Sequence, residues 1–205
     1  MKRIGLLGGS FNPAHRGHRR MSLAAIEALG LDELWWLVSP GNPLKPAKGM
    51  APYPARLASA RGMARGTRIR VSDLETRLGT RFTVDTVTAI VRRNRADRFI
   101  WLMGADTVAQ FHQWKEWRRL ARTIPIAVMS RPGYKTQARA ARAMGWLRGF
   151  VHPAATARRW TNWSAPAISL LRLPPDPTSA TRLRALDPDW HRRFAAAAPT
   201  RHPRS

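Results

Sequence analysis

The sequence contains no cysteine, few acidic residues and no long apolar run. The absence of cysteine excludes disulfide bonds, thiolate zinc sites, iron–sulfur clusters and cysteine nucleophiles. The first apolar run is much shorter than a secretory signal or a membrane span, so we expect a soluble, unprocessed, cytoplasmic protein with no membrane partner. With 205 residues, of which 44% are hydrophobic, the chain is long enough for a domain with a sizeable core.

Acidic residues are scarce: 12 Asp and Glu face 36 Lys and Arg, which gives a formal net charge of +24. A nucleic-acid-binding protein would concentrate such charge on one face, among exposed aromatic residues. Here the basic residues, most of them arginine, are scattered through nearly every segment. We interpret the charge as compositional bias that attracts anionic substrates, and we predict no specific nucleic-acid partner.

Strand-like and helix-like segments alternate along the chain. Short apolar runs predict strands over 2–7, 34–38, 69–74, 99–103, 124–129 and 168–173. Helical spacing predicts helices over 17–29, 56–65 and 83–93, a helix-like stretch up to 122, another over 136–146, and one entered through 178–179. This alternation is typical of βαβ units. We therefore expect a Rossmann-like α/β fold, with a doubly wound, mostly parallel sheet and helices on both faces.

We expect a single domain over 1–198 and a frayed tail over 199–205. Each polar segment of interest directly follows a predicted strand. These segments are 8–18, the Pro-rich loop from 40, 104–106, 131–134 and 178–184. Because the carboxyl ends of parallel strands meet at one edge of a sheet, the segments should converge there.

The segment from Gly8 to His18 has the residues of a phosphate site. Gly8 and Gly9 let a ligand approach the backbone, and N–H groups at the following helix start suit an anion. His15 and His18 are three residues apart, so both imidazoles should point the same way and hold one phosphate together. A turn and two ordinary histidines would explain each feature singly, but not their combination.

This segment resembles the GGxFxPxHxGH signature of the nucleotidyltransferase superfamily that carries a His-x-Gly-His motif, with Asn12 where many relatives have Asp. The segment 178–184 resembles the superfamily's ISxTxxR element, with Ser179, Thr181 and Arg184 at the matching positions. Two hydroxyls and a guanidinium at a helix start form a second anion clamp. For that segment alone, an ordinary Ser/Thr N-cap is the preferred interpretation.

Further elements make the chain similar, nearly end to end, to bacterial nicotinate-nucleotide adenylyltransferases. They are 40–46, 82–83, 104–106, 111–114 and 130–134. The resemblance implies that the 5′-phosphate of nicotinate mononucleotide attacks the α-phosphorus of ATP, giving deamido-NAD and pyrophosphate. The partners are then ATP and nicotinate mononucleotide. Mg²⁺ should arrive with ATP, because the motif offers no carboxylate cage for a metal.

The resemblance also implies roles for the matched residues. Catalysis falls to His15, His18, Lys45 and Arg184. ATP binding falls to Gly8, Gly9, Ser10, Phe11, His15, His18, Gly104, Asp106, Ser179, Thr181 and Arg184. Binding of nicotinate mononucleotide falls to Asn42, Lys45, Thr83, Trp114, Lys115 and Arg131.

In this assignment Trp114 stacks on the pyridine ring, and Thr83 with nearby backbone N–H groups receives the nicotinate carboxylate. Lys115 replaces an aromatic residue common in the family, and Trp117 is a candidate for the second stacking wall. Without the resemblance, core packing is the preferred reading of Trp114 and Trp117.

Three other functions remain open. A sister nucleotidyltransferase would act on another phosphate ester, such as phosphopantetheine. A binding protein on the same fold would hold ATP without releasing pyrophosphate. A basic nucleic-acid-binding protein would show steeply salt-dependent binding and no turnover. A monomer and a homo-oligomer are equally compatible with the sequence.

Overall fold

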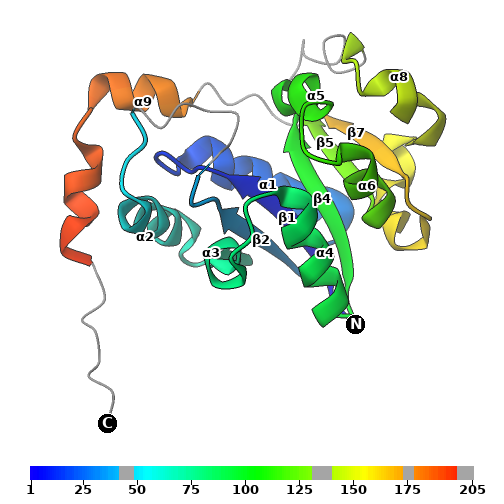
Figure 1. The fold of residues 1–205 in the computed structure, drawn as a ribbon, viewed down its shortest axis with the longest axis horizontal. Helices are drawn as coiled ribbons and strands as arrows, with labels where there is room; N and C mark the ends of the chain where they lie inside the picture. Colours follow the sequence, from blue (N-terminus) through cyan, green and yellow to red (C-terminus); the bar gives the residue numbers. More distant parts are fainter. Residues whose placement is uncertain (42–48, 131–139, 173–177, 198–205) are drawn as a thin grey trace.

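A seven-stranded parallel sheet forms the centre of the protein (Figure 1). The computed structural model describes residues 1–41, 49–130, 140–172 and 178–197. The strands are β1 (Arg3–Gly9), β2 (Glu33–Val38), β3 (Ile69–Ser72), β4 (Arg98–Gly104), β5 (Ile126–Ser130), β6 (Val151–His152) and β7 (Ile168–Arg172). They are ordered β3-β2-β1-β4-β5-β7-β6, and each neighbouring pair is parallel. The predicted doubly wound α/β fold is confirmed.

Helices cover both faces of this sheet. The α-helices are α1 (Arg16–Leu29), α2 (Tyr53–Ala64), α3 (Leu74–Leu78), α4 (Thr83–Arg93), α5 (Ala105–Phe111), α6 (Trp117–Thr123), α8 (Met144–Leu147) and α9 (Ala180–Leu186). The described residues also include three 3₁₀ segments: η1 (Arg148–Phe150), η2 (Ala154–Asn162) and η3 (Trp190–Ala197). No described helix is both long and apolar enough to cross a bilayer.

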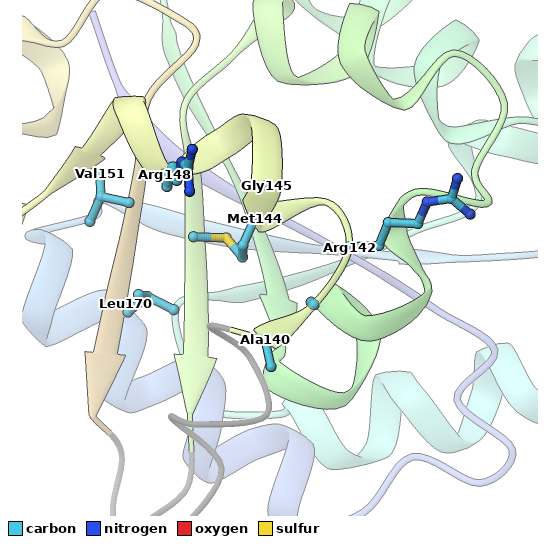
Figure 2. Close-up of a pocket in the computed structure, with 8 residues that line it drawn as sticks. Ala140, Arg142, Met144, Gly145, Arg148, Val151 and Leu170 are labelled. Carbon is cyan, nitrogen blue, oxygen red and sulfur yellow. The ribbon is translucent and has the colours of Figure 1, made fainter.

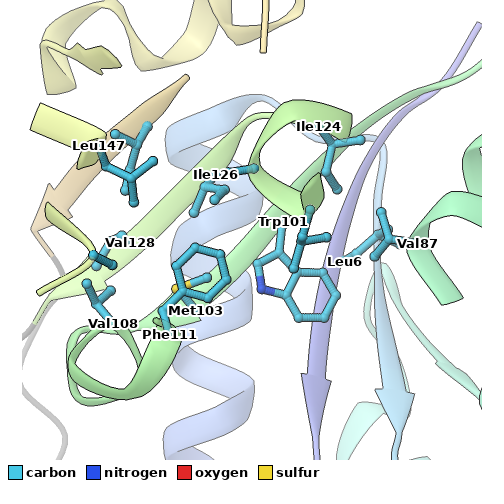
Figure 3. Packing of buried hydrophobic residues seen from close by; sticks show 14 of the residues in the cluster. Leu6, Val87, Trp101, Met103, Val108, Phe111, Ile124, Ile126, Val128 and Leu147 are labelled. Atoms are coloured by element: carbon cyan, nitrogen blue, oxygen red, sulfur yellow. The ribbon is translucent and has the colours of Figure 1, made fainter. Parts of the chain in front are cut away.

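The core is divided into two layers by the alternation of side chains along each strand. In β4, Trp101 and Met103 face the layer of α4, α5, α6 and α8 (Figure 3), whereas Ile100 and Leu102 face α1, α2 and η2. Both layers are apolar. For this reason the central strands are continuous hydrophobic runs, which made them recognisable in the sequence.

The direction of the chain reverses between β1 and β4. From β1 the chain runs outward to β2 and β3, and it then returns to place β4 on the other side of β1. A crevice at the carboxyl ends of the strands on either side of such a reversal is the usual ligand site of this architecture. Gly9 and Gly104 end these two strands, so the loop after β1 and the start of α5 border the crevice.

Some element boundaries differ from the prediction. The strand predicted over 69–74 ends at Ser72, and Leu74 begins α3, whose five residues are too few to show helical periodicity. The stretch predicted up to 122 is two helices, because Glu116 adopts a left-handed conformation with φ 47° before α6 begins. The strand predicted from 124 begins at Ile126, after Pro125, which cannot donate a ladder hydrogen bond.

The edge strand β6 was not predicted, because two residues carry no alternation signal. The helix predicted over 136–146 begins outside the described residues; within 140–146 residue 140 is helical, and the short α8 begins at Met144 after a turn. Residues 198–205 also lie outside the described part. The single domain over 1–198 and the frayed tail therefore stay predictions.

Candidate active site at the β1–β4 crevice

The loop after β1 is shaped by a buried aromatic ring. Phe11 has φ 46°, a conformation that bulky residues rarely adopt. Its ring is 2% exposed and stacks on Trp36, with ring centroids 4.8 Å apart. A side chain at Gly9 would place its Cβ 3.2 Å from this ring, so glycine is favoured there. The Phe11 side chain therefore anchors the loop in the core, and only its backbone can face a nucleotide.

His15 and His18 form a reciprocal cap at the start of α1. The Gly17 N–H donates to Nδ1 of His15 at 3.1 Å, and the His15 N–H donates to Nδ1 of His18 at 3.3 Å. The ring centroids are 3.9 Å apart. Both Nδ1 atoms accept a backbone N–H hydrogen bond, so in the neutral form each ring carries its proton on Nε2. The rings thus bring two Nε2–H donors together at a helix N-terminus, which suits an anion.

Gly17 has a steric reason to be glycine. A Cβ at this position would lie 2.9 Å from the His15 ring and 3.3 Å from the Thr178 carbonyl oxygen. Any side chain would displace the imidazole or push away the segment that enters α9. The glycine inside the His-x-Gly-His motif therefore permits the histidine pair to form.

α9 is joined to the loop after β1 by Arg184. Its Nη1 donates to the Asn12 carbonyl oxygen at 2.6 Å, and its Nη2 donates to Thr181 Oγ1 at 3.3 Å. The Ser179 hydroxyl accepts the Arg182 N–H at 3.2 Å, so Ser179 acts as the N-cap. The structure brings Arg184 to the crevice, whereas Ser179 is an ordinary N-cap of α9.

Asn12 connects the loop after β1 to the end of the Pro-rich segment. Its Nδ2 donates to the Gly49 carbonyl oxygen at 2.9 Å, and its Oδ1 accepts the Ala51 N–H at 3.2 Å. The aspartate of many relatives could accept the second bond but could not donate the first. The departure from the family pattern therefore adds a contact between the two loops.

Arg56 of α2 is a positioning residue that the sequence analysis missed. Its side chain is 1% exposed and donates to four carbonyl oxygens: Ser10 at 2.7 Å, Ser39 at 2.7 Å, Pro40 at 3.0 Å and Ala51 at 3.0 Å. Burial lowers the pKa of this guanidinium. One buried cation thus holds together the loops that follow β1 and β2.

A cavity of about 260 Å³ opens beside these loops. Its lining residues are Gly8, Gly9, Ser10, Ser39, Gly41, Glu75, Arg81, Phe82, Thr83, Trp101, Gln113, Trp114 and Lys115. Six of the residues predicted to bind ATP or the mononucleotide therefore line this one cavity: Gly8, Gly9, Ser10, Thr83, Trp114 and Lys115.

Aromatic rings form much of the cavity wall. The Trp101 and Trp114 rings meet edge to face, with centroids 6.1 Å apart. Lys115 Nζ lies 4.5 Å from the Phe82 ring centroid and 3.7 Å from Asp85 Oδ2. Trp117 is not among the lining residues and packs on other aromatic side chains of the core, so it does not supply the second wall. Phe82 and Trp101, which the prediction omitted, are the additional rings.

The remaining predicted residues fall outside the cavity or outside the described residues. Gly104 ends β4, and Asp106 is exposed in the first turn of α5, with its Oδ1 against Gly104. Asn42, Lys45 and Arg131 lie outside the described part of the chain. Among the described residues, no three His, Asp or Glu side chains form a cluster that could hold a metal ion.

Glu75 is a second residue that the sequence analysis missed. It lines the cavity from α3 and is 7% exposed. Burial raises the pKa of its carboxyl to about 7, and a hydrogen bond with Ser39 lowers it in part. Because the chain has only 12 acidic residues, each of them could have been considered as a site residue. The five residues of α3 were too few to be predicted as a helix, so the position of Glu75 could not be inferred.

Comparisons with known proteins agree on the family. A model described as cytidylyltransferase-like matches residues 6–186. A protein of Erythrobacter litoralis named "Probable nicotinate-nucleotide adenylyltransferase" is 58% identical over 94% of this chain and 88% of its own. One of the same name from Parvibaculum lavamentivorans is 50% identical over 89% and 90%. The chain belongs to the cytidylyltransferase-like family, among the nicotinate-nucleotide adenylyltransferases.

Structural comparison gives the same fold for a distant adenylyltransferase. The nicotinic acid mononucleotide adenylyltransferase of Plasmodium falciparum, complexed with NaAD, has a TM-score of 0.66 and 16% identity, covering 90% of this chain and 83% of that one. At this identity the likeness concerns the arrangement of strands and helices. The adenylyltransferase fold thus accounts for the crevice between β1 and β4.

For this member of the adenylyltransferase family, Glu75→Gln should increase stability at alkaline pH. Protonation of Glu75 favours folding, and that stability is complete below pH 4.5 and is lost as the pH rises to about 7. The amide does not ionise, so its free energy of unfolding should exceed that of the wild type by about 3 kcal/mol at pH 8 and by under about 1 kcal/mol at pH 5. Urea unfolding measures both; Glu27→Gln, on the exposed surface of α1, is the control.

A larger hollow of about 570 Å³ lies on the β6–β7 side of the sheet (Figure 2). Met144, Val151 and Leu170 form its apolar wall, with Arg148 beside them, whereas the Arg142 side chain extends away from this wall. None of the described residues implied by the adenylyltransferase resemblance lines it. The smaller cavity, which adjoins the histidine pair's loop, is therefore the candidate active site.

Proposed function

We propose that the protein transfers the adenylyl group of ATP to nicotinate mononucleotide, forming deamido-NAD and pyrophosphate. The observation that carries the proposal is the adjacency of two sites. A loop ending in the His15–His18 pair suits phosphates, and it adjoins a cavity lined by Thr83 and Trp114. One site would hold the triphosphate, and the other the pyridine nucleotide. We place the reaction in the cytoplasm, which supplies ATP.

In the proposed reaction an oxygen of the mononucleotide phosphate attacks the α-phosphorus of ATP. A new P–O bond forms, the bond to the bridging α–β oxygen breaks, and pyrophosphate leaves without a covalent enzyme intermediate. The Nε2–H groups of His15 and His18 donate to the ATP phosphates, and Arg184, with Lys45, balances the negative charge of the leaving group. Mg²⁺ would enter on the phosphate oxygens of ATP and supply further charge neutralisation.

The cavity residues would orient the mononucleotide. The Trp114 ring stacks on the pyridine, and the N–H groups at the start of α4, from Thr83, receive the carboxylate. Lys115 lies at the same cavity and favours an acid over an amide. Arg131 and Asn42 are assigned to the mononucleotide, and Asp106 to the ATP ribose, on the family resemblance.

Trp114→Ala should weaken binding of nicotinate mononucleotide by about fivefold to a hundredfold, since stacking of a base on an aromatic side chain is worth about 1–3 kcal/mol. Isothermal titration calorimetry measures the dissociation constant. Trp163→Ala, which removes a ring stacked on His152, should leave it unchanged. Unchanged affinity in the Trp114 variant would leave that ring with only its packing against Phe111 and Trp101.

The test of the function is pyrophosphate release from ATP and Mg²⁺ with a panel of acceptors. Nicotinate mononucleotide should give the highest kcat/KM, and nicotinamide mononucleotide, phosphopantetheine and phosphocholine much lower values. A higher value with another ester would assign the protein to a sister transferase. ATP binding with no pyrophosphate from any acceptor would contradict an enzyme function altogether.

A further inference from the structure

Glu75 is the buried acidic group of the cavity for which the proposed reaction has no role. Among the described residues that line the cavity it is the only carboxyl. Within the described part of the chain it forms no ion pair. A buried carboxylate without a cation is costly. A carboxyl that lines a ligand cavity therefore indicates a ligand that compensates its charge.

Other charged and titratable groups lie on α2, on and beside α3, and on the cavity wall. They are Tyr53 and Arg56 of α2, Asp73 and Arg77 next to or within α3, and Arg81 and Lys115 of the cavity wall. Arg56 is engaged by four carbonyl oxygens and Lys115 by Asp85. Burial is the largest influence on the pKa of Glu75, which is about 7, ahead of the hydrogen bond with Ser39.

Burial favours a neutral Glu75 while the cavity holds no substrate, and the hydrogen bond with Ser39 offsets this only in part. The Ser39 hydroxyl donates its single proton to the Gly41 carbonyl oxygen, and the same hydroxyl is the partner of Glu75. The hydroxyl proton cannot serve both acceptors at once, so Ser39 can donate to an ionised Glu75 only by giving up its bond to Gly41. An ionised Glu75 needs new donors.

We propose that Glu75 binds the ribose hydroxyls of the pyridine mononucleotide as a carboxylate, and that it releases its proton when the nucleotide enters. The inference rests on the proposed function. A carboxylate repels the phosphate and the nicotinate carboxyl, and Trp114 takes the ring face, so the ribose hydroxyls are the donors left to meet it. The ribose joins ring to phosphate, and Glu75 lines the same cavity as Trp114 and Ser10.

The test compares the wild type with Glu75→Gln and, as a control, Glu27→Gln. Calorimetry gives the dissociation constant of nicotinate mononucleotide at pH 6 and pH 8. At pH 8 Glu75→Gln should bind about tenfold to a hundredfold more weakly, the loss expected for hydrogen bonds to a charged group. At pH 6 this ratio should shrink about tenfold, because few wild-type molecules are then ionised. Titration of the ligand's phosphate is common to all proteins and cancels in the ratio.

The deoxy analogues assign the contact to the sugar. With 2′-deoxy and 3′-deoxy nicotinate mononucleotide, at least one analogue should bind the wild type and Glu75→Gln with nearly equal affinity at pH 8. An undiminished ratio with both analogues, or a ratio near one with the parent nucleotide, would overturn the role of Glu75. Absence of binding to the wild type at either pH would instead overturn the proposed function, and this inference with it. Unfolding curves of each variant show whether it is folded.

Discussion

His18→Ala should lower kcat by about 10²–10³-fold, the loss typical of removing one preorganised donor to a transition state. His18 Nδ1 accepts the His15 N–H, so Nε2 carries the proton that a phosphate oxygen would receive. Charge grows on those oxygens as pyrophosphate leaves, so the donor contributes most in the transition state. Affinity for nicotinate mononucleotide, which binds in the neighbouring cavity, should be nearly unchanged. Steady-state pyrophosphate release and calorimetry measure the two quantities.

Two further variants separate catalysis from helix capping. His18→Gln keeps an acceptor for the His15 N–H, as glutamine does in a capping box, and should recover the stability lost in His18→Ala without recovering its turnover. His191→Ala removes a histidine from η3, away from the crevice, and should leave kcat unchanged. A loss below tenfold in His18→Ala would move the main phosphate contact to other residues.

Arg56→Met should destabilise the protein by about 3–5 kcal/mol and disorganise both loops of the crevice. The substitution keeps apolar volume but leaves four carbonyl oxygens without their donor. Each buried acceptor left unpaired costs about 1–3 kcal/mol, and relief of the desolvated guanidinium offsets part of the sum. KM should rise for both substrates, because the loops after β1 and β2 hold both sites. Urea unfolding and initial rates report these effects.

Arg61→Met is the matched control, since Arg61 lies on the same helix with its side chain exposed. It should change the free energy of unfolding by less than about 0.5 kcal/mol. Arg56→Lys keeps the charge, but one ammonium cannot reproduce the fork that reaches carbonyl groups of separate loops. If Arg56→Met were as stable and active as Arg61→Met, the four bonds would have no structural weight.

The sequence was sufficient to predict the order of strands and helices around β1, α1 and β4. These strands are buried on both faces and α1 has one apolar face, so composition and periodicity coincide there. The histidine pair was predictable for the same reason: three-residue spacing at a helix start fixes which side chains are neighbours. Local sequence patterns were therefore sufficient to predict the loop after β1 and its histidine pair.

Residues whose importance comes from distant partners could not be predicted in this way. The carbonyl partners of Arg56 lie up to 46 positions away, and one arginine among 36 basic residues carries no distinguishing pattern. Glu75 gains its properties from burial under loops that are far from it in sequence. Trp117 shows the opposite case: the resemblance made it a candidate for the second wall, but it packs on Phe111 and Trp146, as its three-residue spacing from Trp114 had indicated.

The bond from Arg184 to the Asn12 carbonyl joins residues 172 positions apart. During translation, the loop after β1 therefore leaves the ribosome long before Arg184, whose guanidinium donates to this loop. A nascent or prematurely terminated chain ending before α9 should have the histidine motif but not the assembled triphosphate site. Competence for catalysis would then begin only once α9 has been translated and has joined the loop after β1.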